Sequence, residues 1–159
     1  RMRLETIQRT DADTYTRSRA LLLMHAQLVE DDRAARLYLD QLFLMPENRY
    51  NPLYLTAQAQ IQVNEARYEA ALHSANRAEL RWQAIPSGLI VDKLSEILEV
   101  RARAHQGLFY QSEDMEDLDD AIDAWDRYRE HARRHSRADL LRHAEQELAR
   151  LEDVRERLQ

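Results

Sequence analysis

Apolar residues recur every three or four positions along most of the chain, with polar residues between them. Leu21, Met24 and Leu28 show this spacing, which places side chains on one face of an α-helix. No useful length of sequence alternates apolar and polar residues with the period of two that marks a half-buried strand. The chain is therefore expected to be all-α.

Capping and helix-breaking residues divide this pattern into seven segments. Asp11 is expected to cap the first helix, and the acidic run at 30–32 to end it and cap the second. Asn51 is expected to cap the third, with Pro52 at its first helical position, where a missing N–H is tolerated. The predicted helices cover about 12–29, 33–45, 52–63, 65–82, 89–110, 115–135 and 137–158.

Two further caps and two connections complete this division. Asn64 is expected to end the third helix and cap the fourth. Ser136, with Asp139 three positions later, resembles a capping box before the last helix. Loops are expected at 83–88 and 111–114, and residues 1–9 are expected to be the tail of a preceding helix.

Short connections between long helices indicate antiparallel hairpins. The expected units are 11–46, 51–82 and 88–135, followed by a helix over 136–158 whose polar outer face suits the end of a stack. Residues 1–159 are expected to form one domain of this kind. Because the chain begins with Arg1 rather than Met, we expect it to be part of a longer protein.

Small residues recur in the second helix of each predicted pair. The stretch EARYEAALHSANRAEL, residues 65–80, carries alanines that permit close helix packing. In each pair a small residue is followed four positions later by a residue on the same helix face. These anchors are Ala34 with Tyr38, Ala71 with Ala75 and Ala78, and Ala121 with Trp125.

This pattern resembles the tetratricopeptide repeat, a helix–turn–helix unit of about 34 residues. Ala34, Tyr38 and Pro46 stand at the motif's spacing. Tyr68, Ala71 and Ala78 match its second-helix entry. The resemblance covers residues 14–135 and implies a right-handed stack of hairpins with a concave, partner-binding groove.

The chain also departs from that motif. It lacks the aromatic, Leu-Gly and Tyr signature of the first helix, and Ala75 stands where an aromatic is preferred. The spacings between anchors are 71 − 34 = 37 and 121 − 71 = 50 residues. A helical-hairpin solenoid of another lineage is the alternative interpretation.

The composition of the chain favours a helical fold and argues against some classes of function. Only 2 glycines and 3 prolines occur, whereas 33% of residues are charged, a balance that favours long helices. The formal net charge of −6 disfavours nucleic acid. No run approaches the roughly 20 apolar residues of a membrane span, so membrane insertion is not expected. There is no cysteine.

Lys93 is the only lysine, leaving 23 − 1 = 22 arginines. This bias indicates a GC-rich bacterial genome, or alternatively a surface for bidentate carboxylate recognition. A soluble protein of the bacterial cytoplasm or periplasm fits, and the sequence does not choose between these compartments.

Two clusters are candidates for metal chemistry. His131 and His135 lie at i and i+4, a spacing that can share zinc. However, Ala132 stands where the zinc-protease motif has Glu, and positive charge also suits the end of a helix. The carboxylates of 112–126 lack the glycine of a calcium loop, since none follows Gly107. No metal, no cofactor and no enzymatic activity are therefore expected.

The expected function is non-enzymatic binding or scaffolding of a peptide or protein partner in the concave groove. The register implied by the resemblance places six residues there: Arg19, Gln27, Thr56, Gln60, Arg101 and His105. The alternative is self-association, as a possible homodimer, through one end of the stack or the last helix. That helix carries an apolar stripe of Leu141, Ala144, Leu148, Leu151 and Leu158.

Overall fold

The computed structural model describes the backbone of residues 2–84 and 90–159, and the side chains of residues 11–84 and 93–159. Over these residues the fold is all-α and contains no strand. Seven α-helices and one 3₁₀ turn follow in order: α1 Met2–Leu28, α2 Asp32–Phe43, η1 Pro46–Asn48, α3 Pro52–Asn64, α4 Tyr68–Gln83, α5 Ile90–Ser112, α6 Met115–Arg134 and α7 Ala138–Leu158.

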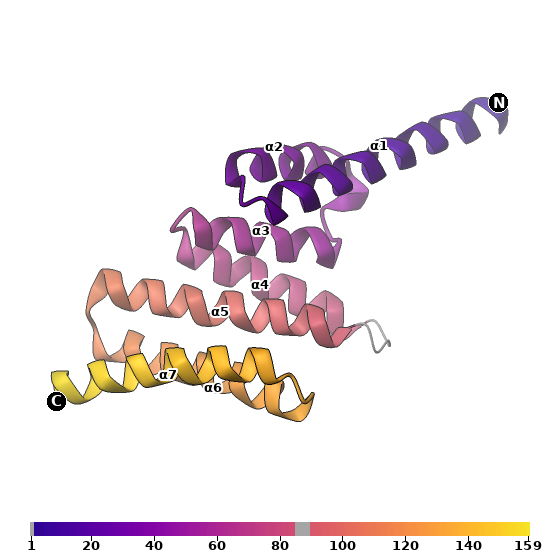
Figure 1. The fold of residues 1–159 in the computed structure, drawn as a ribbon. Helices are drawn as coiled ribbons and strands as arrows, with labels where there is room; N and C mark the ends of the chain where they lie inside the picture. The colour runs from indigo at the N-terminus through magenta and orange to yellow at the C-terminus, as the bar shows by residue number, and fades with distance from the viewer. Residues whose placement is uncertain (1, 85–89) are drawn as a thin grey trace.

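The helices stack in chain order (Figure 1). Each α-helix contacts the one that follows it, and α3 also contacts α5. In Figure 1 the α1/α2 pair lies at the top and the α6/α7 pair at the bottom, so the termini lie at opposite ends. None of the described helices has the length and apolar character needed to cross a membrane.

The first helix is longer than expected. It runs without interruption from Met2 to Leu28, so Asp11 is an exposed residue within the helix rather than its cap. The expected separate tail at 1–9 belongs, from Met2 onward, to this same helix. The reason is that no glycine or proline lies between Met2 and Leu28, and a polar residue alone does not end a helix. The N-terminal half of α1 extends beyond the other helices (Figure 1).

Three helix starts carry side-chain caps, and the first two of them were predicted from the sequence. The Asp31 carboxylate accepts a hydrogen bond from the Ala34 N–H at 3.0 Å. Asn51 Oδ1 accepts from the Leu53 N–H at 3.0 Å, with Pro52 at the first helical position. Asp114 caps α6 in the same way. These bonds satisfy backbone donors that have no partner within the helix.

A residue with left-handed backbone precedes four helices. Its φ is 56° at Glu30, 59° at Ala66, 56° at Glu113 and 54° at Ser136. After Ala66, the Arg67 N–H donates to the Gln62 carbonyl at 2.8 Å. This closes the preceding helix in a Schellman-type turn. Equivalent bonds follow Glu30 and Ser136, from Asp31 to Ala26 at 2.8 Å and from Arg137 to Ala132 at 2.9 Å.

The expected caps at Asn64 and Ser136 are therefore wrong. Asn64 is the last residue of α3, and Arg67 precedes α4 without a side-chain cap. Ser136 occupies the left-handed position, and Arg137 takes the cap position of α7. In both turns a backbone bond closes the preceding helix, and the helix that follows begins without a side-chain cap. The loop expected at 83–88 falls largely outside the described residues.

The core consists of three clusters arranged along the stack. Ala71, Ala75 and Ala78 are fully buried in the middle cluster, together with Ala59 of α3 and Ala104 of α5. Small side chains from three helices permit the contact of α3 with α5. The middle cluster thus contains alanine at position 75, where the repeat motif prefers an aromatic residue.

The end clusters lie around α2 and α6. Near α2, the fully buried residues are Ala35, Leu39 and Leu42. Ala34 and Tyr38, the expected anchors, are only partly buried at the edge of that cluster. Around α6, Trp125 is almost completely buried. The cluster also takes in Ala121 and the middle of the α7 stripe, which is Ala144, Leu148 and Leu151.

Candidate functional site

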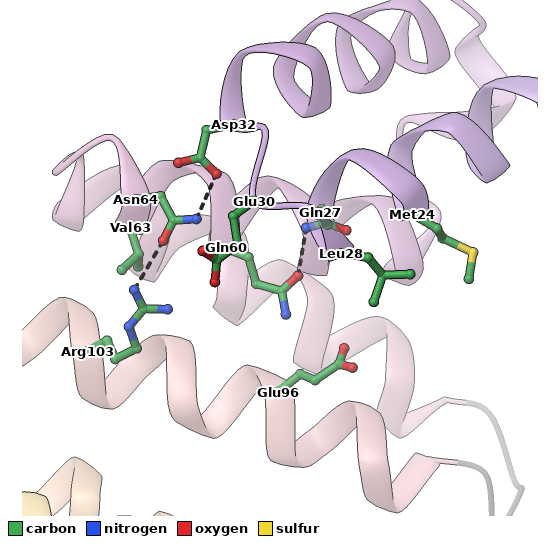
Figure 2. A pocket seen from close by; sticks show the side chains of 10 residues that line it. All are labelled: Met24, Gln27, Leu28, Glu30, Asp32, Gln60, Val63, Asn64, Glu96 and Arg103. Carbon is green, nitrogen blue, oxygen red and sulfur yellow. Dashed lines mark hydrogen bonds between the residues drawn. The ribbon is translucent and has the colours of Figure 1, made fainter.

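A hollow lies between α1, α3 and α5. It has a volume of about 850 Å³. Figure 2 shows it with Met24 and Leu28 of α1 on one side and Glu96 and Arg103 of α5 on the other. Alternate helices of the stack thus form its walls. Its ten lining residues are Met24, Gln27, Leu28, Glu30, Asp32, Gln60, Val63, Asn64, Glu96 and Arg103.

Hydrogen bonds between polar side chains hold the walls together. Gln27 Nε2 of α1 donates to Gln60 Oε1 of α3 at 3.0 Å. Asn64 Nδ2 donates to Asp32 Oδ1 at 3.0 Å, and Arg103 Nη2 donates to Asn64 Oδ1 at 3.1 Å. These bonds are drawn in Figure 2. The first connects α1 to α3, and the other two connect α2 to α5 by way of Asn64 at the end of α3. The floor of the hollow is therefore formed by polar side chains, and their hydrogen bonds join the helices around it.

The α1 wall is apolar. Met24 is 59% exposed and Leu28 is 81% exposed, and both line the hollow. Leu21, one turn earlier on the same helix face, is 66% exposed. In contrast, Leu23 and Ala26 are buried in the core. The stripe of Leu21, Met24 and Leu28 is therefore not used to pack α1 against the rest of the chain.

Negative charge predominates among the ionisable lining residues. Glu30, Asp32 and Glu96 carry carboxylates, and Arg103 carries the only guanidinium among the ten. Lys93, one turn before Glu96, pairs with it at 3.2 Å. Among the described side chains, no cation pairs with Glu30. The hollow thus offers carboxylates to a ligand more than it offers cations.

A second hollow, of about 180 Å³, lies toward α7 and shares the lining residue Arg103 with the first. Its floor is a chain of hydrogen bonds. The Trp125 indole N–H donates to Gln106 Oε1 at 2.9 Å, and Gln106 Nε2 donates to Glu147 at 3.1 Å. Its lining comprises Glu99, Arg103, Gln106, Trp125, His143 and Glu147.

Two of the six residues expected to line a groove, Gln27 and Gln60, meet in the larger hollow. Thr56 is buried instead: its hydroxyl donates to the Pro52 carbonyl at 2.7 Å and accepts from Trp82 Nε1 at 3.3 Å. Arg19 lies outside the lining, with its guanidinium 4.7 Å from the centre of the Tyr15 ring.

Arg101 and His105 lie in a different place. Arg101 is buried and donates to Asn76 Oδ1 of α4 at 2.7 Å from Nη2, and it pairs with Glu79. His105 lines a small hollow toward α6 with Arg101, and burial lowers the pKa of its imidazole. The structure therefore does not bring these two residues together with Gln27 and Gln60.

The lining includes residues that sequence reasoning did not select. Met24 and Leu28 show helical spacing, but that spacing indicated a buried face. On α5, Arg103 lines the hollow rather than Arg101, two positions earlier. Two positions turn a helix by about 200°, so an error of this size in register moves a residue to the opposite face. No sequence signal separates these two arginines.

The candidate metal ligands of the sequence do not form a site of three or more residues among the described side chains. No group of three or more His, Cys, Asp or Glu residues there is arranged to hold a metal ion. The rings of His131 and His135 lie 4.5 Å apart, near the end of α6.

Comparison with protein-family models, with curated proteins and with solved structures gives no match. The hollow is therefore interpreted from its own geometry.

Proposed function

We propose that the chain is a non-enzymatic interaction module that holds a segment of a partner protein in the groove between α1, α3 and α5. The observation that carries this proposal is the hollow of about 850 Å³, whose walls come from alternate helices of the stack. Its lining offers hydrogen bonding, ion pairing and apolar contact, and it contains no histidine, serine or lysine side chain.

We further propose that the stack is a divergent, right-handed solenoid of the tetratricopeptide-repeat type. A residue with left-handed backbone follows the first helix of three pairs. These residues are Glu30 after α1, Ala66 after α3 and Glu113 after α5. The spacings are 66 − 30 = 36 and 113 − 66 = 47 residues, the first of them close to the 34 of the family. Fully buried alanines at 71 and 78 support the proposal.

Affinity capture with matched variants tests this function. The immobilised chain is compared with a Met24→Gln/Leu28→Gln double variant and with Leu80→Gln, which changes an exposed leucine of α4 outside the lining. Glutamine keeps helix propensity, so circular dichroism should be the same for all three. We expect partner proteins to be retained by the wild type and Leu80→Gln and lost by the double variant. Equal retention by all three would remove the groove from the proposal.

Self-association is the second candidate, and exposed apolar side chains favour α1 over α7 as its surface. Leu21, Met24 and Leu28 are all more than half exposed. Of the α7 stripe, Leu158 is 55% exposed, whereas Ala144 and Leu148 are buried against α6. Light scattering over a range of concentrations tests this candidate: a mass that stays at one chain would exclude it.

A further inference from the structure

We propose that the occupant of the groove is a basic amphipathic helix of a partner protein. The helix would lay apolar residues on the α1 stripe of Leu21, Met24 and Leu28, and direct lysine or arginine toward the carboxylates of the groove. This inference rests on the proposed function and adds the chemistry of the partner. It differs from the alternative interpretation of the arginine-rich sequence, in which arginines form a surface that recognises carboxylates.

The apolar wall is the first reason. Leu21, Met24 and Leu28 stand at i, i+3 and i+7, and they remain 66%, 59% and 81% exposed. Fully burying a side chain of this kind contributes about 1.5–3 kcal/mol. Their spacing is the one that a second helix matches, because apolar rows on two helices interlock at three- and four-residue intervals.

The charge of the groove is the second reason. The two hollows that share Arg103 are lined by five carboxylates, on Glu30, Asp32, Glu96, Glu99 and Glu147. Against them the same linings set one guanidinium, that of Arg103. Two more cations lie beside the lining and pair with it: Lys93 with Glu96, and Arg150 with Glu147. The linings therefore remain net negative, which attracts a cationic segment and repels an acidic one.

Size is the third reason. An α-helix about 10 Å wide fills roughly 420 Å³ per turn of 5.4 Å. The larger hollow, of about 850 Å³, thus admits about two turns. Two turns suffice to present apolar residues at i, i+3 and i+7, which is the length of the α1 stripe. Volume, spacing and charge agree on the same occupant.

Selection from a random peptide library tests the inference without a known partner. A phage-displayed library of peptides about 16 residues long, roughly four helical turns, is selected against the immobilised full chain. Winning peptides are synthesised, and their Kd values are measured by fluorescence anisotropy at low and high salt. The variants are Met24→Gln/Leu28→Gln and Glu96→Gln. Their controls are Leu80→Gln and Glu152→Gln, each at an exposed position outside the linings.

We expect the winning peptides to be net basic, with apolar residues three or four positions apart, and to gain helicity on binding. Met24→Gln/Leu28→Gln should weaken Kd by about tenfold or more. Glu96→Gln should weaken it by about threefold and reduce its salt dependence. Both controls should bind as the wild type does.

Several results would overturn the inference. Groove-dependent peptides that are acidic, or that lack the apolar spacing, would leave the proposed function standing and refute the basic helix. An absence of any peptide sensitive to Met24→Gln/Leu28→Gln would refute both. If the chain alone forms dimers that this double variant disperses, the occupant is a second copy, and the partner helix is wrong.

Discussion

Gly107 of α5 lies directly beneath the ring of Tyr68, the first residue of α4. A Cβ atom added at Gly107 would stand 2.3 Å from Tyr68 Cζ and 2.4 Å from Cε1. Glycine in the middle of a helix costs about 1 kcal/mol relative to alanine, so this position sacrifices helix stability for contact between helices. Tyr68 is half-buried and packs against the middle cluster, among alanines of α3, α4 and α5.

Gly107→Ala is therefore expected to destabilise the chain even though alanine is the better helix former. The added methyl group forces the Tyr68 ring out of its contact, and overpacking of this kind costs about 1–3 kcal/mol. In a Tyr68→Ala background the same substitution should instead stabilise, by up to about 1 kcal/mol. Urea unfolding of the four chains measures both effects. The same sign in both backgrounds would show that the ring does not require the glycine.

Ala66→Gly is expected to raise the free energy of unfolding. Residue 66 has φ 59°, a conformation in which a Cβ is unfavourable and glycine is not, so we expect a gain of about 0.5–1 kcal/mol. Ala66 is exposed, so no packing is lost. Ala149→Gly, at an exposed position inside α7, is the control and should lose about 1 kcal/mol. Thermal or urea unfolding distinguishes the two, and a loss at position 66 would contradict the left-handed turn.

Gln106→Leu is expected to lower the free energy of unfolding by about 1–3 kcal/mol. The leucine has the size of the glutamine but leaves the indole N–H of the buried Trp125 without its acceptor. Gln111→Leu changes the same residue type at an exposed position of α5 and should shift stability by no more than about 0.5 kcal/mol. Equal effects would show that the Trp125 bond contributes nothing.

Stability is expected to fall at alkaline pH because of Tyr128. Burial, more than the nearby carboxylates of Glu99 and Asp139, raises the pKa of its phenol above 10. Below about pH 10 the phenol is protonated in both states, so stability does not depend on it. Above that pH the unfolded chain releases the proton first, and unfolding becomes easier by up to about 1.4 kcal/mol per pH unit.

The measurement is the free energy of unfolding in urea between pH 9 and pH 11, a range on either side of the reference pKa of about 10. Tyr128→Phe should flatten the decrease but not abolish it, because burial also raises the pKa of Tyr54. Tyr110→Phe, at an exposed tyrosine, should leave the slope unchanged. An unaltered slope in Tyr128→Phe would contradict the assignment.

Helix positions could be predicted from the sequence where side-chain chemistry marks them. Asp31 and Asn51 cap helices because their oxygens accept backbone N–H groups, and such residues are recognisable in a sequence. The turns at Ala66 and Ser136 could not be recognised. Glycine is the usual signal of a left-handed residue, and here alanine and serine adopt that conformation.

The register of α5 was beyond prediction for a different reason. Ile97 and Val100 belong to the middle cluster, whereas Leu98 and Phe109 belong to the cluster around α6. A helix buried on two sides has no single apolar face, so its periodicity does not orient it. The prediction for the α1 stripe was wrong for the opposite reason. Its residues have the spacing of a buried helix face, but their side chains are exposed.

Arg103 lines both hollows and donates to Asn64 at the end of α3. Because one guanidinium belongs to both linings, the two hollows share a single positive charge. Neutralising it, as in Arg103→Gln, would make the two linings more negative at once.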